Sequence, residues 1–163
     1  MSNDTPVFTM LVGLPGTGKS TWITHEYQEV PFVDYVPLST DAEIEKLCAS
    51  QGITYDQGFK LFIDQAQKIM NEKMADAIKN RHDIVLDQTN LTRKSRARKM
   101  AQLPRAYKKY AVFFPVPEEA EWKRRLSARP GKCIPQSVLD DMQRGLEPPS
   151  TDEGFDEVMV IAQ

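Results

Sequence analysis

One stretch of the sequence has residue types and spacing that predict phosphate chemistry. Residues 13–20 read Gly-Leu-Pro-Gly-Thr-Gly-Lys-Ser and match the pattern G-x-x-x-x-G-K-[ST] in full. Its glycines let backbone N–H groups close around phosphate oxygens, and the start of the following helix attracts anions. Lys19 is expected to reach the phosphate that is transferred, and the Ser20 hydroxyl to bind Mg²⁺. The expected nucleotide-binding residues are Gly13, Pro15, Gly16, Thr17, Gly18, Lys19, Ser20 and Thr21.

The alternative is a chance glycine-rich turn, and the sequence around the pattern argues against it. The apolar run 7–12 predicts a buried strand just before the turn, and a helix is predicted from Lys19 to about Gln28. The ligand is therefore expected to be ATP with Mg²⁺. No Asn-Lys-x-Asp guanine-reading motif occurs, and Gln88 rather than Glu follows Asp87, which favours kinase chemistry over a GTP switch or a motor ATPase.

Two acidic residues follow predicted strands and are candidates for catalysis and metal binding. Asp41 comes after a weak strand at 35–38, and as a general base it would orient an acceptor hydroxyl and take its proton. The alternative role of Asp41 is to favour the start of a helix, for which Thr40 to Glu43 has the form of a capping box. Asp87 closes the strand 84–86 and would hold Mg²⁺, unless it is a turn residue.

The residues that follow Asp87 are candidates for contact with the acceptor or a phosphate. Thr89 and Asn90 stand at the same predicted sheet edge, although turn chemistry explains them equally well. Thr92 can cap a basic helix that runs to Leu103. No Asp or Glu occurs between Gln88 and Pro117, so the basic segment that starts at Arg93 either tracks a nucleic acid backbone or forms a solvated face.

Arg125 and Arg129 are four residues apart on a helix predicted from Pro117 to about Arg129. Both guanidinium groups would share one face and fold over the triphosphate, so that this helix acts as a lid. The alternative is a solvated helix in which Glu121 pairs with Arg125.

Strands alternate with helices along the chain, which predicts an α/β fold with a parallel sheet of about five strands and helices on both faces. Besides the strands already named, strands are predicted at 110–116 and 157–161, and a long amphipathic helix at 59–81. A length of 163 residues fits one domain that spans 1–163.

Composition excludes several classes of protein. The chain is 40% hydrophobic and 27% charged, which is ordinary for globular proteins. No apolar run has the length of a membrane helix, and Met1 to Pro6 lack the pattern of a secretory leader, so a cytoplasmic protein is expected. Cys48 and Cys133 are too far apart in the sequence to indicate a disulfide framework or a zinc site.

Taken together, these motifs resemble the 5′-hydroxyl polynucleotide kinase domain of polynucleotide kinase/phosphatases and the bacterial and phage P-loop kinases grouped with it. The resemblance rests on residues 13–22, on Asp87 to Leu91, on Arg125 to Pro135 with Val138 and Met142, and on Glu147 to Phe155. It implies a P-loop kinase fold with a helical lid, Asp41 as general base, Arg125 and Arg129 in the lid, and DNA or RNA as the acceptor.

The sequence departs from this family at one position. Members usually carry an arginine three residues after the base, which holds a phosphate of the acceptor strand, and that position here is Ile44. The departure leaves a second acceptor class open, namely a hydroxymethylated base within DNA or a small-molecule alcohol. A third alternative is a module that binds ATP without transferring phosphate.

Overall fold

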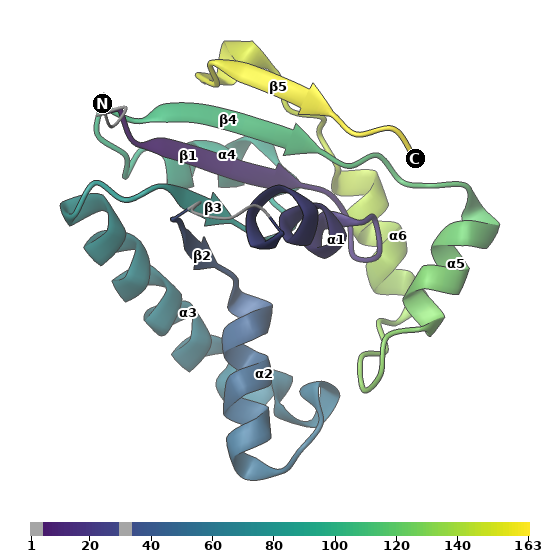
Figure 1. The fold of residues 1–163 in the computed structure, drawn as a ribbon. Coiled ribbons are helices and arrows are strands. Elements are labelled where there is room, and N and C mark those ends of the chain that lie inside the picture. The colour runs from purple at the N-terminus through teal and green to yellow at the C-terminus, as the bar shows by residue number, and fades with distance from the viewer. Residues whose placement is uncertain (1–4, 30–33) are drawn as a thin grey trace.

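The computed structural model describes residues 5–29 and 34–163. Within these ranges five strands form one sheet in the order β2-β3-β1-β4-β5, and every pair is parallel. The elements are β1 (Val7–Val12), α1 (Lys19–Ile23), η1 (Thr24–Gln28), β2 (Val36–Leu38), α2 (Thr40–Gln51), α3 (Tyr55–Lys79), β3 (Ile84–Leu86), α4 (Arg93–Met100), β4 (Lys108–Phe113), α5 (Glu119–Ser127), α6 (Gln136–Gly145), η2 (Thr151–Glu153) and β5 (Glu157–Val160). The predicted α/β fold with helices on both faces is confirmed (Figure 1).

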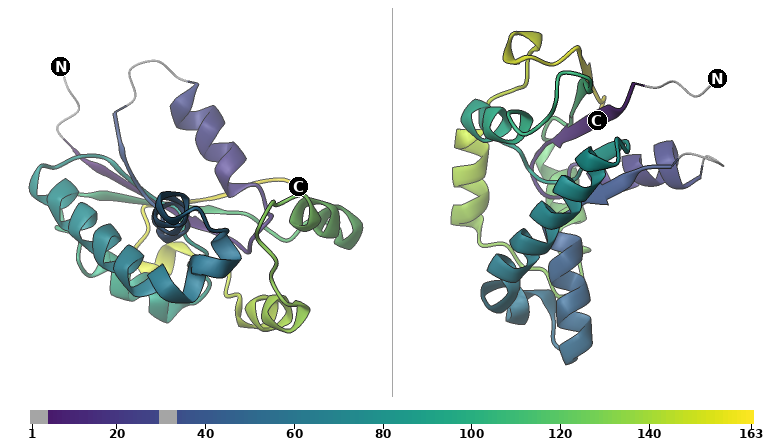
Figure 2. Two further views of the ribbon diagram at one scale, coloured as in Figure 1. Left: turned by 90° about the horizontal axis from the view of Figure 1, so that it is seen from below. Right: turned by 90° about the vertical axis from the view of Figure 1, so that its left-hand side faces the viewer.

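Both faces of the sheet are buried, as a parallel sheet requires. Helix α1 covers one face, while α3, α4 and α6 lie on the other (Figure 2). Alternate residues of β1 point to opposite faces. Phe8, Met10 and Val12 pack with residues of α3 and α4, whereas Leu11 packs with Ile23 of α1. All four of these β1 side chains are fully buried.

The register of the strands brings three loops together. Leu86 at the end of β3 lies opposite Met10 of β1 and also opposite Leu38 at the end of β2. Because the strands are parallel, the loops that follow β1, β2 and β3 all leave the sheet at the same edge. Gly13, Asp41 and Asp87 are therefore brought to one place, as the sequence predicts.

The predicted elements are present, with shifts at several ends. The helix after the glycine-rich loop reaches Gln28 as predicted, but its second half, η1, is a π-helix. The basic helix α4 ends at Met100 rather than Leu103, and β4 begins at Lys108 and ends at Phe113 rather than running from 110 to 116. Thr92 caps α4 as predicted, because its hydroxyl accepts a hydrogen bond from the Ser95 amide.

The predicted cap of α2 is wrong by one residue. Ser39 has an extended backbone and its hydroxyl accepts a hydrogen bond from the Ala42 amide at 3.2 Å, so Ser39 is the N-cap. Thr40 is already helical and its side chain is buried against Met70. Sequence spacing alone did not show which of the two adjacent hydroxyl residues is the cap. The contact with Met70 buries Thr40 and leaves Ser39 to cap the helix.

Among the described residues, no helix is long and apolar enough to cross a membrane. The sequence prediction about a secretory leader concerns Met1 to Pro6, and the first four of these residues lie outside the described ranges.

Candidate active site

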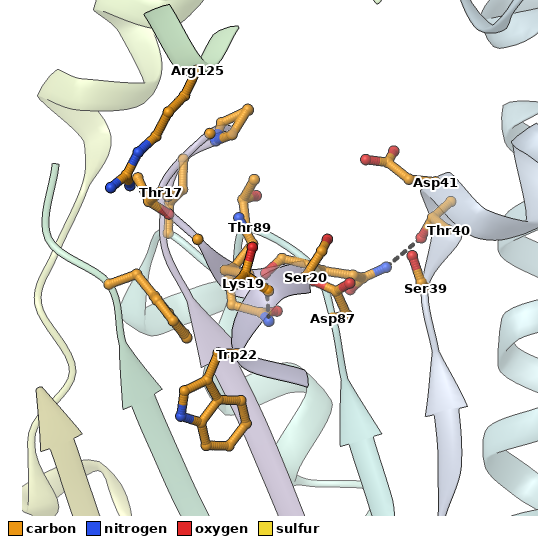
Figure 3. Close-up of a pocket in the computed structure, with 18 of the residues that line it drawn as sticks. Thr17, Lys19, Ser20, Trp22, Ser39, Thr40, Asp41, Asp87, Thr89 and Arg125 are labelled. Atoms are coloured by element: carbon orange, nitrogen blue, oxygen red, sulfur yellow. Dashed lines mark hydrogen bonds between the residues drawn. The ribbon is translucent and has the colours of Figure 1, made fainter. Parts of the chain in front are cut away.

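A cavity of about 1320 Å³ lies at the edge of the sheet where the parallel strands end. The glycine-rich loop, the residues after β2 and β3, and helices α4 and α5 all contribute to its wall. In Figure 3, Lys19, Ser20 and Asp87 lie between Arg125 on one side and Asp41 on the other. The cavity therefore brings together most of the residues that the sequence assigns to nucleotide, metal and acceptor, whereas Gly13 and Arg93 are not among its lining residues.

The loop that follows β1 has the backbone that phosphate binding needs. Gly16 and Gly18 adopt φ angles of 77° and 99°, which glycine reaches without strain. A Cβ at Gly13 would lie 2.9 Å from the Thr17 hydroxyl and 3.0 Å from the Phe114 carbonyl oxygen, so a side chain there would force its neighbours to move. The Thr17 hydroxyl donates to the Leu14 carbonyl at 2.8 Å and closes the turn from within. Glycine therefore stands at the three positions of this loop where a side chain would strain the backbone or crowd its neighbours.

Lys19 is the first residue of α1, and its ammonium is turned back toward the loop. Its Nζ donates to the carbonyl oxygens of Gly13 and Leu14, each at 2.9 Å. Burial lowers the pKa of Lys19 to about 8, although Asp87 and Asp41 partly counteract this by favouring the charged form. A buried ammonium that contacts only neutral carbonyls is stabilised when a negatively charged phosphate binds beside it.

Asp87 comes directly after β3, and its amide donates to the Leu38 carbonyl at 2.8 Å, which fixes the start of this loop. Burial raises the pKa of the Asp87 carboxyl, and the charge of Lys19 lowers it in part. Figure 3 shows Asp87 beside Ser20 of α1. A hydroxyl and a carboxylate that line the same cavity suit a Mg²⁺ ion that takes its other ligands from phosphate and water.

Asp41 stands on the first turn of α2, on the far side of the cavity from α5. Its Oδ1 accepts a hydrogen bond of 2.6 Å from the Tyr55 hydroxyl, which belongs to the first turn of α3. Burial, with Asp41 as a further cause, raises the pKa of the Tyr55 phenol, so this group remains a donor. Tyr55 was missed by the sequence analysis, and its only sequence signal is its place at the start of a capped helix.

The two arginines of the predicted lid both line the cavity. Arg125 donates from Nε to Glu121 at 2.7 Å and from Nη1 to Gln163 at 3.0 Å. The predicted pairing with Glu121 is therefore present, and it leaves Arg125 at the cavity wall. Arg129 Nη1 is buried and has no hydrogen-bond partner among the described residues. An unpaired buried guanidinium N–H favours an incoming anion.

The structure divides the candidate acceptor residues into two groups. Thr89 and Asn90 line the cavity, but the Asn90 amide is buried and donates to the Leu11 carbonyl at 2.7 Å. Arg93 is not brought to the cavity, because its guanidinium bonds to Ser150 and to Asp152, the latter at 2.9 Å. Lys99, from the same helix α4, lines the cavity in its place.

The acid-free basic segment does not form a continuous surface. Arg96 is fully buried and its guanidinium pairs with Glu153 of η2, with an Nε–Oε1 distance of 2.8 Å. Arg93 pairs with Asp152 of the same element. The acidic residues that neutralise these two arginines come from more than fifty positions later in the chain, which no local pattern reveals.

One further contact anchors the glycine-rich loop. The indole N–H of Trp122 on α5 donates to the Pro15 carbonyl at 2.8 Å, and Trp122 packs with Leu14 and Leu139. A Cβ at Gly16 would lie 3.1 Å from Leu126 of the same helix. The lid helix and the loop are thus in direct contact. Sequence analysis identified Trp122 only as part of a helix.

These residues fit a nucleoside triphosphate with Mg²⁺. The open turn of the loop, the Lys19 ammonium and the unpaired Arg129 Nη1 suit a polyphosphate. The described residues contain no group of three or more His, Cys, Asp or Glu side chains that could hold a metal by themselves. Ser20 and Asp87 both line the cavity and would hold Mg²⁺ against the phosphates.

Comparison with known proteins agrees with this geometry. Residues 8–149 match a family described as "AAA domain". The chain belongs to this family, which is one of P-loop kinases. P-loop kinases generally use ATP and Mg²⁺. The match covers β1 to the end of α6, so it includes every element that lines the cavity except the segment after β5.

A curated protein is similar to this chain over most of the chain's length. Heterogeneous nuclear ribonucleoprotein U-like protein 2 of Homo sapiens is 26% identical over 156 residues, which is 91% of this chain and 20% of that protein. The chain therefore spans about a fifth of the length of its curated relative.

Solved structures share the fold. In the Pnkp1/Rnl/Hen1 RNA repair complex, one chain has 23% identity and a TM-score of 0.68, over 93% of this chain and 47% of that one. A sugar kinase from Janibacter has 21% identity and a TM-score of 0.58, over 96% of this chain and 84% of that one. The predicted resemblance to P-loop kinases, including a polynucleotide kinase, is confirmed for the fold.

Proposed function

We propose that this protein is an ATP-dependent kinase that transfers the γ-phosphate to a hydroxyl of a polynucleotide, most simply the 5′-hydroxyl end of DNA or RNA. The observation that carries the proposal is the position of Asp41. Its carboxylate faces the same cavity as the phosphate loop, and one of its oxygens is already held by Tyr55. The other carboxylate oxygen is left for an acceptor hydroxyl.

The chemistry assigned to each residue follows from its position. The acceptor oxygen forms a bond to the γ-phosphorus as the bond from that phosphorus to the β–γ bridging oxygen breaks, and ADP leaves. Asp41 takes the proton of the hydroxyl and later passes it to water. Lys19, Arg125 and Arg129 offset the charge on the phosphoryl oxygens. Mg²⁺, held at Ser20 and Asp87, supplies further charge neutralisation between the outer phosphates.

Two observations favour a polynucleotide as the acceptor. The motif Asp87 to Leu91 and the stretch Glu147 to Phe155 resemble those of polynucleotide kinases, and the second stretch contacts the first. Glu147 joins the two, since its amide donates to the Leu91 carbonyl at 2.9 Å and its carboxylate accepts from the Arg93 amide at 2.7 Å. In addition, the fold is that of a chain in an RNA repair complex.

A second acceptor class is favoured by Ile44. This residue is fully buried and packs with Cys48 and Ala66 between α2 and α3. The position that usually supplies an arginine to the acceptor strand therefore belongs to the apolar core. A hydroxymethylated base within DNA, or a small-molecule alcohol such as a sugar, is the alternative acceptor, and a sugar kinase is among the proteins that share the fold.

A labelling experiment tests the proposal. The protein is incubated with Mg²⁺, ATP labelled at the γ-phosphate, and matched oligonucleotides that carry either a 5′-hydroxyl or a 5′-phosphate. We expect label only in the 5′-hydroxyl strand. A duplex with hydroxymethylated bases and blocked ends, and a set of sugars, are run beside it, and label in one of these instead selects the second acceptor class.

Two variants distinguish transfer from binding. Asp41→Asn should abolish transfer while ATP still binds, whereas Lys19→Met should weaken both. If no acceptor is labelled and ADP release never depends on an acceptor, the protein is an ATP-binding module and the proposed kinase function is rejected.

A further inference from the structure

The cavity extends beyond the phosphate loop to a wall formed by α2, α3 and α4. Asp41 on α2, Gln67 on α3 and Lys99 on α4 all line it. The residues assigned to the triphosphate come instead from the loop after β1 and from α5 with the segment that follows it. The wall of α2, α3 and α4 is therefore the surface that remains for the acceptor.

Lys99 is a half-buried cation in this wall without an acidic partner. Its ammonium donates to the Asn90 side-chain oxygen, and no Asp or Glu of the described residues forms an ion pair with it. Of the other lysines that line the cavity, Lys132 pairs with Glu45, whereas Lys19 belongs to the phosphate loop and donates to two backbone carbonyls there. Burial lowers the pKa of Lys99 to about 8, which reflects the energy that its charge costs there.

The contact with Asn90 holds the Lys99 ammonium in place without cancelling its charge. Asn90 is itself fixed, because its amide donates to the Leu11 carbonyl at 2.7 Å. An ammonium has three donors, and a neutral amide oxygen uses one of them. The remaining donors and the full charge are available to an anion.

Gln88, in the loop after β3, also lines the cavity and carries an atom whose hydrogen bonding is not satisfied. Its Nε2 donates to the Thr40 hydroxyl, which orients the amide, while its Oε1 is buried and has no hydrogen-bond partner within residues 5–29 and 34–163. A buried acceptor without a donor is costly, and an N–H or O–H of a ligand relieves the cost. The cavity thus carries a site for an anion at Lys99 and an unmet hydrogen-bond acceptor at Gln88.

We propose that Lys99 binds an acidic group of the acceptor and so selects acceptors that carry a phosphate near the receiving hydroxyl. This inference rests on the proposed kinase function. In a strand with a 5′-hydroxyl end, the phosphate between the first and second nucleosides is the group concerned. Lys99 on α4 then binds the acceptor phosphate, a role that the apolar, buried Ile44 on α2 does not fill.

Two acceptors that differ only by one phosphate test the role of Lys99. Thymidine 3′-monophosphate and thymidine each offer the same 5′-hydroxyl, and the ratio of their kcat/KM values measures recognition of the phosphate. We expect Lys99→Met to lower this ratio by about tenfold or more, because a charge-assisted contact to phosphate is lost. Lys99→Arg should retain more of the ratio than Lys99→Met, and Lys68→Met, an exposed lysine of α3, should leave it unchanged.

A second measurement does not depend on turnover. An amine-acylating reagent is applied to the wild-type protein, and modification of Lys99 is followed by peptide mass spectrometry. Thymidine 3′-monophosphate should protect Lys99, and thymidine should not. Should Lys99→Met prove unstable, Lys99→Gln replaces it, since an amide restores a donor to Asn90 without the charge.

The outcomes separate this inference from the proposed function. Phosphate transfer to both acceptors with the same ratio in wild type and Lys99→Met overturns the role of Lys99 and leaves the kinase intact. If neither acceptor is phosphorylated, protection of Lys99 by the monophosphate alone still supports the anion site, and equal modification with and without it rejects the site.

Discussion

The Tyr55 hydroxyl donates a 2.6 Å hydrogen bond to Oδ1 of Asp41 and links the first turn of α3 to the first turn of α2. The Tyr55 ring in turn lies beneath the Lys132 ammonium, 4.5 Å from the ring centroid. Lys132 belongs to the loop between α5 and α6. The carboxylate assigned as general base is therefore held by a tyrosine that also contacts the segment following the lid helix.

Replacing Tyr55 with Phe tests whether this hydrogen bond orients the base. The change keeps the ring under Lys132 and removes only the hydroxyl. We expect kcat to fall by about tenfold, since a hydrogen bond to a charged group is lost, while KM for ATP changes little. Steady-state kinetics with a 5′-hydroxyl oligonucleotide measure both constants.

A double variant supplies the control for Tyr55. If Tyr55 acts through Asp41, then Tyr55→Phe should cost little further activity once Asp41 is replaced by Asn. Independent, additive losses would instead mean that Tyr55 acts elsewhere.

The loop between α5 and α6 is tied to the start of α3 by a pair of backbone contacts. The Cys133 amide donates to the Asp56 carboxylate at 2.8 Å, and the Asp56 amide donates to the Gly131 carbonyl at 3.1 Å. Asp56→Ala removes the first contact, so we expect the loop to open more often and trypsin to cut faster after Lys132. KM for ATP should rise as well, because Arg129 belongs to this loop and lines the cavity.

Asp64 provides a matched control for Asp56, since it is an exposed aspartate of the same helix. Asp64→Ala should leave both the rate of cleavage and KM for ATP unchanged. Equal cleavage of the two variants would show that the Asp56 contact does not restrain the loop.

Nucleotide affinity should depend on pH through Lys19. Its pKa in the free protein is lowered to about 8 from an ordinary value of 10.5, so the ammonium is lost as pH rises through 8. A triphosphate requires the charged form, and its binding therefore takes up a proton near pH 8. We expect Kd for ATP to be nearly constant below pH 7 and to rise by up to tenfold per pH unit above 8.

Calorimetry in buffers of different ionisation enthalpy measures that proton uptake directly. Lys19→Met should bind ATP weakly, and its binding should show no proton uptake that increases near pH 8.

The lowered pKa of Lys19 also affects the free energy of unfolding. Between pH 8 and 10.5 the unfolded chain holds more protons at Lys19 than the folded one, so this group makes stability rise with pH across that window.

Arg96 is the largest fully buried side chain within residues 5–29 and 34–163, and it supports the loop after β3. Its Nη1 donates to the carbonyl oxygens of Asn90 and Leu91 at 2.9 and 3.1 Å, and its Nε and Nη2 pair with Glu153. Arg96→Met leaves the Glu153 carboxylate without its charged partner and with only the Ser150 amide as a donor, so we expect a loss of about 3–5 kcal/mol in the free energy of unfolding. Urea denaturation measures the change.

The neighbouring Arg98 serves as the comparison, because it is exposed on the same helix. Arg98→Met should alter the free energy of unfolding by no more than about 0.5 kcal/mol. If both variants change the free energy of unfolding by a similar, small amount, Arg96 does not support the loop.

The sequence predicted those features that depend on neighbouring residues. The turn from Gly13 to Ser20, the buried strand that precedes it and the cap at Thr92 are all set by local spacing, and the structure has them. The adjacent hydroxyls of Ser39 and Thr40 gave the wrong cap, because a contact with Met70 on α3 decides which is buried.

Distant contacts account for the parts of the site that the sequence did not reveal. Tyr55 reaches Asp41 across fourteen positions, and Arg93 is drawn from the cavity by Asp152, fifty-nine positions later. A run of basic residues says nothing about which of them is neutralised by a later segment. Lys99 therefore stood out only when the fold placed it in the cavity wall without an acid.

A single cavity at the sheet edge has a consequence for inhibitor design. The glycine-rich loop and the wall of α2, α3 and α4 open into the same space, so donor and acceptor would occupy it at the same time and phosphate would pass without a covalent protein intermediate. A compound that joins adenosine to a nucleoside through a polyphosphate chain would span both halves. Its affinity would exceed that of either half alone, because the second half binds as an intramolecular event.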